Sequence, residues 1–364
     1  MIENIINENV LIDQIVLNNI IIKDIYDIDF LAKEGIIKVN KHPPYYYAGH
    51  GKVFSHLSIK GDGMIVSMRA GVLSQRGLPI PFCFMTLSVP EDPIHKNLHC
   101  LSIKDYKEYI RSIQNHLFTR YGIDINLDNA GVKEIEINRT LMLNHAFIEY
   151  DRVFRLIMNR LPGILSNQIK FQNLSGDKTG EVSYYANSKQ TQHSSRYRNF
   201  KIYDKTYCSG RDTDNNISLV RFEVRLIGTQ GIKRAFKTNR LSELTDELIT
   251  NYFNRFIEEN VLKRITKWIG ERDRLLKNKI LTSNRKDNWL VNLLRDCSTW
   301  ENQYQYPLIL DVEEVFPIIE KVEKDSRNRS RIRMALRRHA SSHESLFSNG
   351  DHQRLEEVMK KLEN

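Results

Sequence analysis

The chain of 364 residues has only four cysteines, and they are not spaced as metal or disulfide sites usually require. Cys83, Cys100, Cys208 and Cys297 are widely separated and form no CxxC pair, which excludes a zinc ribbon. A framework of disulfides is not expected at this length either, so a reducing compartment fits the sequence better. We therefore predict a cytoplasmic protein.

Long apolar runs are also missing. The first residues, MIENIINENVLIDQIVLNNIIIKDI, are rich in isoleucine, but Asn, Glu and Asp interrupt them every few positions and no basic region precedes them. This pattern differs from that of a signal peptide or a transmembrane helix, and no other segment approaches about 18 consecutive apolar residues. We expect no membrane partner.

Several common catalytic motifs are absent as well. The glycine-containing stretch SIKGDGMI lacks the GxxxxGK[ST] spacing of a phosphate-binding loop, and no helix is predicted after it. The GxSxG, HExxH and protein-kinase signatures do not occur. The sequence thus argues against a nucleoside-triphosphate site and against these enzyme classes.

What the chain has in excess is positive charge. Lysine and arginine total 54 against 45 acidic residues, which gives a net charge of +9. Such a balance favours a polyanionic partner, although solubility alone explains it about as well. Hydrophobic residues make up 41% of the chain, so a sizeable core can form.

The hydrophobic pattern predicts strands and helices in the first two thirds of the chain. Strands are expected at 82–89, 131–140, 180–188, 198–207 and 217–228, with a further hairpin that turns at 61–63. Helices are expected at 103–121 and 147–163.

Helical periodicity dominates from residue 241 onward, and a polar stretch at 281–288 is a plausible hinge. We therefore predict an α+β protein whose last part is mostly helical. The expected divisions are an N-terminal extension at 1–40, an α+β domain at 41–235 and a helical region at 236–364.

Three of the expected strands have one apolar and one polar face, because alternate side chains of a strand point to opposite sides. The apolar faces carry Ile135, Ile137, Phe200, Ile202, Val220, Phe222, Val224 and Leu226. The polar faces carry Glu134, Glu136, Lys201, Tyr203, Lys205, Arg221, Glu223 and Arg225. If these strands join one sheet with helices behind it, the polar residues form one face, open to solvent or to a ligand.

Residues of these types suit phosphodiester chemistry. The phenol of Tyr203 becomes a nucleophile when it loses its proton, and a nearby lysine or metal ion favours that form. Carboxylates from different strands can bind Mg²⁺ or Mn²⁺, which would polarise the scissile phosphate. The same pattern is also typical of exposed antiparallel strands whose Glu–Arg and Glu–Lys pairs only stabilise a sheet.

The order of three segments resembles the rolling-circle replication initiators, especially the filamentous-phage gene II-type proteins and the related plasmid initiators. The segments are FTRYGIDINLDNAGVKEIEINRTLMLNHAFIEYDRVFRLIMNRLP, RNFKIYDKT and LVRFEVRL, and the resemblance covers roughly residues 45–265. It implies an antiparallel, ferredoxin-like sheet related to the HUH endonucleases, with helices on one face. It also implies an enzyme that nicks one DNA strand at an origin and later rejoins it.

The resemblance implies a role for each matching residue. Tyr203 would attack the phosphodiester, leaving a 5′-phosphotyrosine and a 3′-OH primer, and Lys205 would steady the phosphate or the phenolate. Glu136 and Glu223 would bind Mg²⁺ or Mn²⁺, with Glu134 as the weaker candidate. The side chains expected to contact DNA on this face are Lys201, Arg221 and Arg225.

The sequence departs from the main HUH branch because it has no His-hydrophobe-His triplet. His95 and His99 have a spacing that binds a metal only on a helix, whereas Pro93 and its neighbours predict a loop. We therefore expect a metal site made mainly of carboxylates.

Three other tyrosines lie near the motif. Tyr207 would share the face of Tyr203 if the strand continues, which makes it the rival nucleophile. At most one of the adjacent Tyr184 and Tyr185 can face the polar side, so core packing or an edge position is expected for them.

A basic segment, SRNRSRIRMALRRH at 326–339, contains six arginines and no acidic residue. It predicts a charged helix that binds DNA phosphates, or one whose arginines pair with the acids of DVEEVFPIIEKVEKD at 311–325. The arginines assigned to DNA binding are Arg329, Arg331, Arg333, Arg337 and Arg338.

We predict a replication initiator that nicks and joins DNA through a tyrosine and a divalent ion, acting on a single-stranded or cruciform origin. The alternatives are a non-catalytic DNA-binding protein and a relaxase of a conjugative element with the same chemistry. A host helicase and a second copy of the chain are further partners that such a protein would have. The sequence leaves the metal, the origin and the genetic element open.

Overall fold

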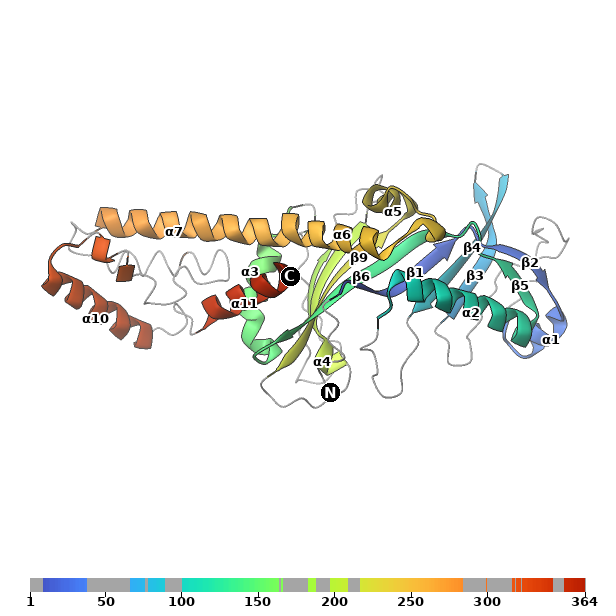
Figure 1. The fold of residues 1–364 in the computed structure, drawn as a ribbon, viewed down its shortest axis with the longest axis horizontal. Helices are drawn as coiled ribbons and strands as arrows, with labels where there is room; N and C mark the ends of the chain where they lie inside the picture. Colours follow the sequence, from blue (N-terminus) through green and yellow to red (C-terminus); the bar gives the residue numbers. More distant parts are fainter. Residues whose placement is uncertain are drawn as a thin grey trace.

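The computed structural model describes residues 9–37, 66–75, 78–88, 100–163, 165, 183–187, 197–208, 217–283, 299, 316–317, 319–321, 323–342 and 350–363. In these residues the chain forms a seven-stranded sheet, a separate two-stranded ribbon, and helices that continue into a long C-terminal arm (Figure 1). The structure confirms the α+β class and the mostly helical C-terminal region.

The seven-stranded sheet is antiparallel at every pairing and has the order β3-β4-β1-β6-β9-β8-β7. Its strands are β1 (Leu11–Asn18), β3 (Val66–Gln75), β4 (Leu78–Ser88), β6 (Gly131–Leu143), β7 (Ser183–Asn187), β8 (Tyr197–Asp204) and β9 (Ser218–Ile227). The ribbon consists of β2 (Ile21–Ile25) and β5 (Ile123–Asn126). Strand β1 lies between β4 and β6, so the isoleucine-rich N-terminal segment supplies an internal strand of the sheet.

The described helices are α1 (Ile28–Lys33), α2 (Ile103–Tyr121), α3 (Asp151–Arg160), α4 (Lys205–Cys208), α5 (Thr229–Phe236), α6 (Asp246–Ile257), α7 (Lys263–Ser283), α10 (Ser326–Ser342) and α11 (Asp351–Glu363). Helix α2 has the predicted bounds: the hydroxyl of Ser102 caps its start, and Gly122, at φ 63°, ends it. A 3₁₀ turn, Phe147–Tyr150, precedes α3, and a π-helical turn, Glu258–Leu262, joins α6 to α7.

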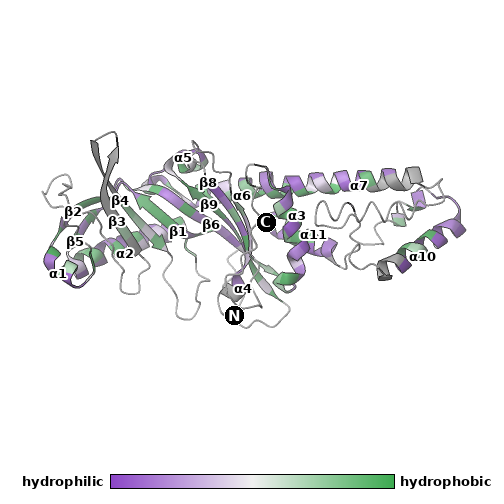
Figure 2. Ribbon diagram, turned by 180° about the vertical axis from the view of Figure 1, so that it is seen from behind, coloured by the Kyte–Doolittle hydropathy of each residue, from purple (hydrophilic) through white to green (hydrophobic). Residues whose placement is uncertain are grey.

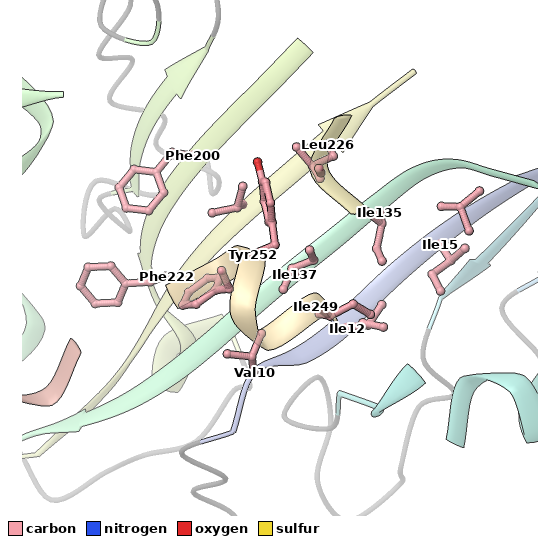
Figure 3. Packing of buried hydrophobic residues seen from close by; sticks show 14 of the residues in the cluster. Val10, Ile12, Ile15, Ile135, Ile137, Phe200, Phe222, Leu226, Ile249 and Tyr252 are labelled. Atoms are coloured by element: carbon pink, nitrogen blue, oxygen red, sulfur yellow. The ribbon is translucent and has the colours of Figure 1, made fainter. Parts of the chain in front are cut away.

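The core lies between one face of the sheet and the helices. The predicted apolar faces of β6, β8 and β9 are fully buried there, since none of their isoleucine, phenylalanine and valine side chains is more than 1% exposed. Figure 3 shows Ile135, Ile137 and Phe222 packed with Ile249 and Tyr252 of α6. The structure thus confirms an antiparallel sheet with helices on one face, and it leaves the polar residues of the strands on the other.

Strand β8 is shorter than predicted. It ends at Asp204, whose partner on β9 is Val220, and Lys205 begins α4 instead of continuing the strand to residue 207. The reason is local: the N–H of Leu219 donates to the side-chain hydroxyl of Thr206, at 2.7 Å, instead of to a backbone carbonyl of β8. The hairpin predicted at 61–63 lies outside the described residues.

The C-terminal helices extend away from the sheet along α7, and α11 returns to it (Figure 1). In Figure 2, hydrophobic residues follow the central strands, whereas hydrophilic residues recur along α7 and α10. Helix α11 packs on α3 and β6 through Leu355, Val358 and Leu362. Among the helices that the structure describes, none has the length and apolarity needed to cross a membrane.

Candidate functional site

A β-bulge in β1 places an acidic residue on the polar face of the sheet. The pairing of β1 with β6 shifts between Ile12, which faces Ile137, and Gln14, which faces Glu136. Asp13 is the extra residue at this shift: its carboxylate points away from the buried Ile12, and because of the bulge Gln14 after it also lies on the polar side, opposite Glu136. Bulges commonly redirect a side chain in this way beside functional sites.

Three carboxylates from adjacent strands gather at this bulge. Asp13 of β1, Glu136 of β6 and Glu223 of β9 each offer an oxygen, and these oxygens all lie within 4.8 Å of one another. Glu136 and Glu223 are buried, while Asp13 is half-buried. An all-oxygen set suits Mg²⁺ or Mn²⁺. Octahedral bonds of about 2.1 Å place neighbouring oxygens about 3.0 Å apart and opposite oxygens about 4.2 Å apart, so the three carboxylates would move closer together around an ion, and water would supply the remaining ligands. The residues fit a divalent metal site.

Each of these carboxylates also has a basic partner. The pairs are Lys201 Nζ with Glu223 Oε1 at 2.6 Å, Arg225 Nε with Glu136 Oε1 at 3.1 Å, and Arg221 Nη1 with Asp13 Oδ1 at 3.6 Å. Register explains two of them, because Lys201 and Arg225 face Glu223 and Glu136 directly across neighbouring strands. The cluster is therefore charge-compensated without an ion.

The environment of Glu136 favours its protonated form. Burial, with the nearby charge of Glu223 as the next cause, raises the pKa of Glu136 from its usual value near 4.5 to about 7, although Lys201 and Arg225 oppose the shift. A divalent ion would compete with this proton, since only the carboxylate binds metal well.

The phenol of Tyr203 is hydrogen-bonded to the cluster. Its hydroxyl donates to Oε2 of Glu223 at 3.2 Å, while Lys201 holds the other oxygen of the same carboxylate. Burial and then the charge of Glu223 raise the pKa of Tyr203 well above 10, against the opposing effect of Arg221. The phenol is therefore protonated in the metal-free protein, and a cation on Glu223 would favour its ionisation.

Lys205 and Glu134 lie near the cluster but outside it. Lys205 is buried at the start of α4, not on the strand face of Tyr203, and its Nζ lies 5.9 Å from the centre of the Tyr203 ring. Glu134 forms an ion pair with Arg225 and is not one of the three clustered carboxylates.

The rival tyrosines are placed differently. The backbone of Tyr207 belongs to α4, so the strand that would have put it beside Tyr203 does not continue. Tyr184 is fully buried and donates to Asp151, as core packing predicts. Tyr185 lies under Lys201, whose Nζ is 5.7 Å from the ring centre. His95 and His99 lie outside the described residues.

Sequence reasoning missed Asp13, and with it two neighbours. Asn138 is buried and its Nδ2 donates to the sulfur of Cys100 at 3.2 Å; that sulfur lies 3.7 Å from Oδ1 of Asp13. Burial raises the pKa of Cys100 to about 11, so the thiol is neutral. The available signal was the spacing of Ile12, Ile15 and Leu17, which skips one position of a regular strand at Asp13.

The arginines of α10 differ in their contacts and in their exposure. Arg333 forms an ion pair with Glu320, Arg329 donates to the carbonyl of Glu323 at 3.1 Å, and Arg333 and Arg337 lie over the ring of Phe316. Arg331, Arg337 and Arg338 are exposed. The helix thus pairs partly with the acidic segment before it and also presents basic side chains to solvent.

Comparison with known proteins gives structural similarity but no match in sequence. No protein-family profile and no curated protein matches the sequence. Among solved structures, the chain is similar to the rolling-circle replication initiator protein from Geobacillus stearothermophilus, with 10% sequence identity and a TM-score of 0.30 over 70% of this chain and 85% of that chain. Because the sequence identity and the TM-score are both low, the proposed function rests on the geometry of the site.

Proposed function

We propose that this protein is a metal-dependent DNA nickase and strand transferase of the replication-initiator type. The observation that carries the proposal is the hydrogen bond between the Tyr203 hydroxyl and Glu223, a member of the three-carboxylate cluster. A nucleophile, a cation site and basic side chains meet on one face of a sheet, and a phosphodiester needs these three elements.

The step transfers a phosphoryl group from a sugar to the tyrosine. The Tyr203 oxygen forms a bond to phosphorus while the bond from phosphorus to the 3′ oxygen breaks, which leaves a 5′-phosphotyrosine and a free 3′-OH. Oε2 of Glu223 orients the phenol by accepting its hydrogen bond, and the phenol proton passes to solvent, because Glu223 must stay a carboxylate to hold an ion. The leaving 3′ oxygen takes a proton from solvent, and rejoining is the reverse reaction.

The other residues of the site bind and orient. Asp13, Glu136 and Glu223 would hold Mg²⁺ or Mn²⁺, which supplies positive charge to the phosphate when bound. Arg221 is fixed in the interior by Thr140, whose hydroxyl accepts from Nε at 3.1 Å, and its charge lowers the pKa of Tyr203. Lys205, close to the Tyr203 ring, would offset charge that develops on the phenolate.

A second reading is favoured by the same ion pairs. Three carboxylates matched by Lys201, Arg221 and Arg225 also describe a sheet that is stabilised without any ion. The protein would then be a DNA-binding protein without catalysis, with α10 as one of its basic surfaces.

Covalent capture separates the two functions. We would incubate the protein with single-stranded oligonucleotides of random sequence and Mn²⁺, and detect protein–DNA adducts that survive SDS. The nickase gives an adduct whose modified residue maps to Tyr203 by mass spectrometry and which Tyr203→Phe abolishes. The matched control is Tyr207→Phe, which keeps the adduct. Retention on DNA without an adduct in any divalent metal would leave only the binding function.

A further inference from the structure

We propose that Lys201 is an internal cation that occupies Glu223 in the metal-free protein and moves to the ring of Tyr185 when a divalent ion binds. The inference rests on the metal centre proposed above and deepens it: it makes Lys201 the residue that sets the affinity of the site for its ion. Ion binding would also free the charge of this lysine to meet a DNA phosphate on the polar face of the sheet.

The position of Lys201 in the sheet brings it near both proposed partners, Glu223 and the ring of Tyr185. On β8, Lys201 faces Glu223 of β9 on one side and Tyr185 of β7 on the other, and directly opposed residues share a face. Its Nζ is 2.6 Å from Glu223 Oε1 and 5.7 Å from the centre of the Tyr185 ring. The second distance is already within the range of a cation–π contact, so a small rotation of the side chain exchanges one partner for the other.

Lys201 is the one of the three cations that can leave. Arg221 is 1% exposed and is held by both Asp13 and Thr140. Arg225 bridges two carboxylates, Glu134 and Glu136, so its departure would leave both without this partner. Lys201 forms its ion pair with one carboxylate, Glu223, and its flexible side chain ends in an ammonium group.

Electrostatics makes the exchange necessary. Glu223 is buried, and Lys201 lies 2.6 Å from one of its oxygens. The lysine therefore occupies the space of a divalent ion and neutralises the charge that would attract one. An ammonium and a divalent ion on one buried carboxylate repel each other strongly where water screens little. Ion binding therefore competes with the Lys201–Glu223 pair, and removing the ammonium group should raise the affinity of the site for a divalent ion.

The first test measures Mn²⁺ affinity, with Mn²⁺ alone as the probe, by isothermal titration calorimetry. Lys201→Met should bind Mn²⁺ at least about tenfold more tightly than the unchanged protein, while Lys201→Arg, which keeps the charge, should remain within about threefold. An unchanged or weaker affinity in Lys201→Met overturns the proposal, because Lys201 would then only support the ligand geometry. Absence of Mn²⁺ binding to the unchanged protein overturns the metal centre and this inference together.

The second test uses the unchanged protein and so does not depend on how a variant folds. Acetylation by an N-hydroxysuccinimide ester is followed by mass spectrometry with and without Mn²⁺. Lys107, which donates to the carbonyls of Ser242 and Leu244 at 3.0 and 2.7 Å, serves as the internal reference. The reactivity of Lys201 relative to Lys107 should rise severalfold with Mn²⁺, and an equal or lower ratio contradicts the release of Lys201.

Discussion

Arg139 on β6 donates a hydrogen bond to the backbone carbonyl of Leu362 on α11 at 3.2 Å, across 223 positions of the chain. The same buried guanidinium donates to the side chain of Asn254 on α6 at 2.8 Å. One side chain thus ties the sheet, a covering helix and the C-terminal helix together. It lies on the opposite face of β6 from Asn138, so it stabilises the sheet that carries the candidate site without taking part in that site.

We predict that Arg139→Met destabilises the protein by about 3 to 6 kcal/mol, because hydrogen bonds to a charged group contribute about 1.5 to 3 kcal/mol each and two are lost. Urea unfolding followed by circular dichroism measures the change. Arg264→Met is the matched control, since Arg264 is exposed on α7 and surface substitutions typically stay within about 0.5 kcal/mol. Equal effects of the two variants would contradict the structural role of Arg139.

Asp13→Asn tests whether the bulge residue is a metal ligand. The substitution keeps the shape of the side chain but removes one of three negative charges, so Mn²⁺ affinity should fall by at least about tenfold, the lower end for disturbing a metal site. Thermal unfolding with and without Mn²⁺ measures this, because an ion at 100 times its dissociation constant stabilises the folded state by about 2.7 kcal/mol.

The control for Asp13→Asn is Asp29→Asn, at an exposed position in the first turn of α1. It should keep the full Mn²⁺-induced shift. If Asp13→Asn also keeps that shift, the ion does not bind at this cluster.

The sheet faces could be predicted from the sequence because β6, β8 and β9 alternate strictly. That alternation put Glu136, Tyr203 and Glu223 on one face, and the structure brings these three together; their catalytic roles stay predictions. Asp13 was missed because the bulge breaks the alternation of β1, and the only local sign of it is the three-residue interval from Ile12 to Ile15. Its strand also pairs with residues as distant as Asn138, and a local sequence pattern does not reveal such pairing.

Other features depend on partners that no local pattern reveals. Arg139 occupies a buried position that the alternation of β6 assigns to an apolar residue, and its partner is a carbonyl near the end of the chain. The predicted end of β8, at residue 207, was wrong for a similar reason. The strand pairing stops where the side chain of Thr206 accepts the hydrogen bond of the Leu219 N–H, although threonine itself favours strands.

The raised pKa of Glu136 predicts how stability changes with pH. The folded protein holds a proton on Glu136 up to a pKa of about 7, whereas the unfolded chain loses it near 4.5. Because the folded state binds more protons between these values, this group's contribution to stability is present at low pH and is lost as pH rises through that window. With EDTA present, the difference in the free energy of unfolding between the unchanged protein and Glu136→Gln should therefore change by up to about 3 kcal/mol from pH 5 to 7.5.

The direction of this change is what matters. Glu136→Gln, which stays neutral, should become more stable relative to the unchanged protein as pH rises. Thermal unfolding at a series of pH values measures the trend. Saturating Mn²⁺ should reduce the difference, since the ion stabilises the carboxylate form that the variant lacks. A difference that is constant with pH would show that Glu136 titrates in its ordinary range.

The two kinds of arginine on α10 predict different consequences of substitution. Arg331 is exposed, whereas Arg333 forms an ion pair with Glu320 and lies over Phe316. Arg331→Gln should therefore weaken binding to duplex DNA uniformly across sequences and lower the slope of log K against log salt by about 1, the value for one lost phosphate contact. Fluorescence anisotropy at several salt concentrations measures the slope. Arg333→Gln should leave the slope nearly unchanged and lower the thermal stability instead; the reverse pattern would mean that Arg333 leaves its partners to bind DNA.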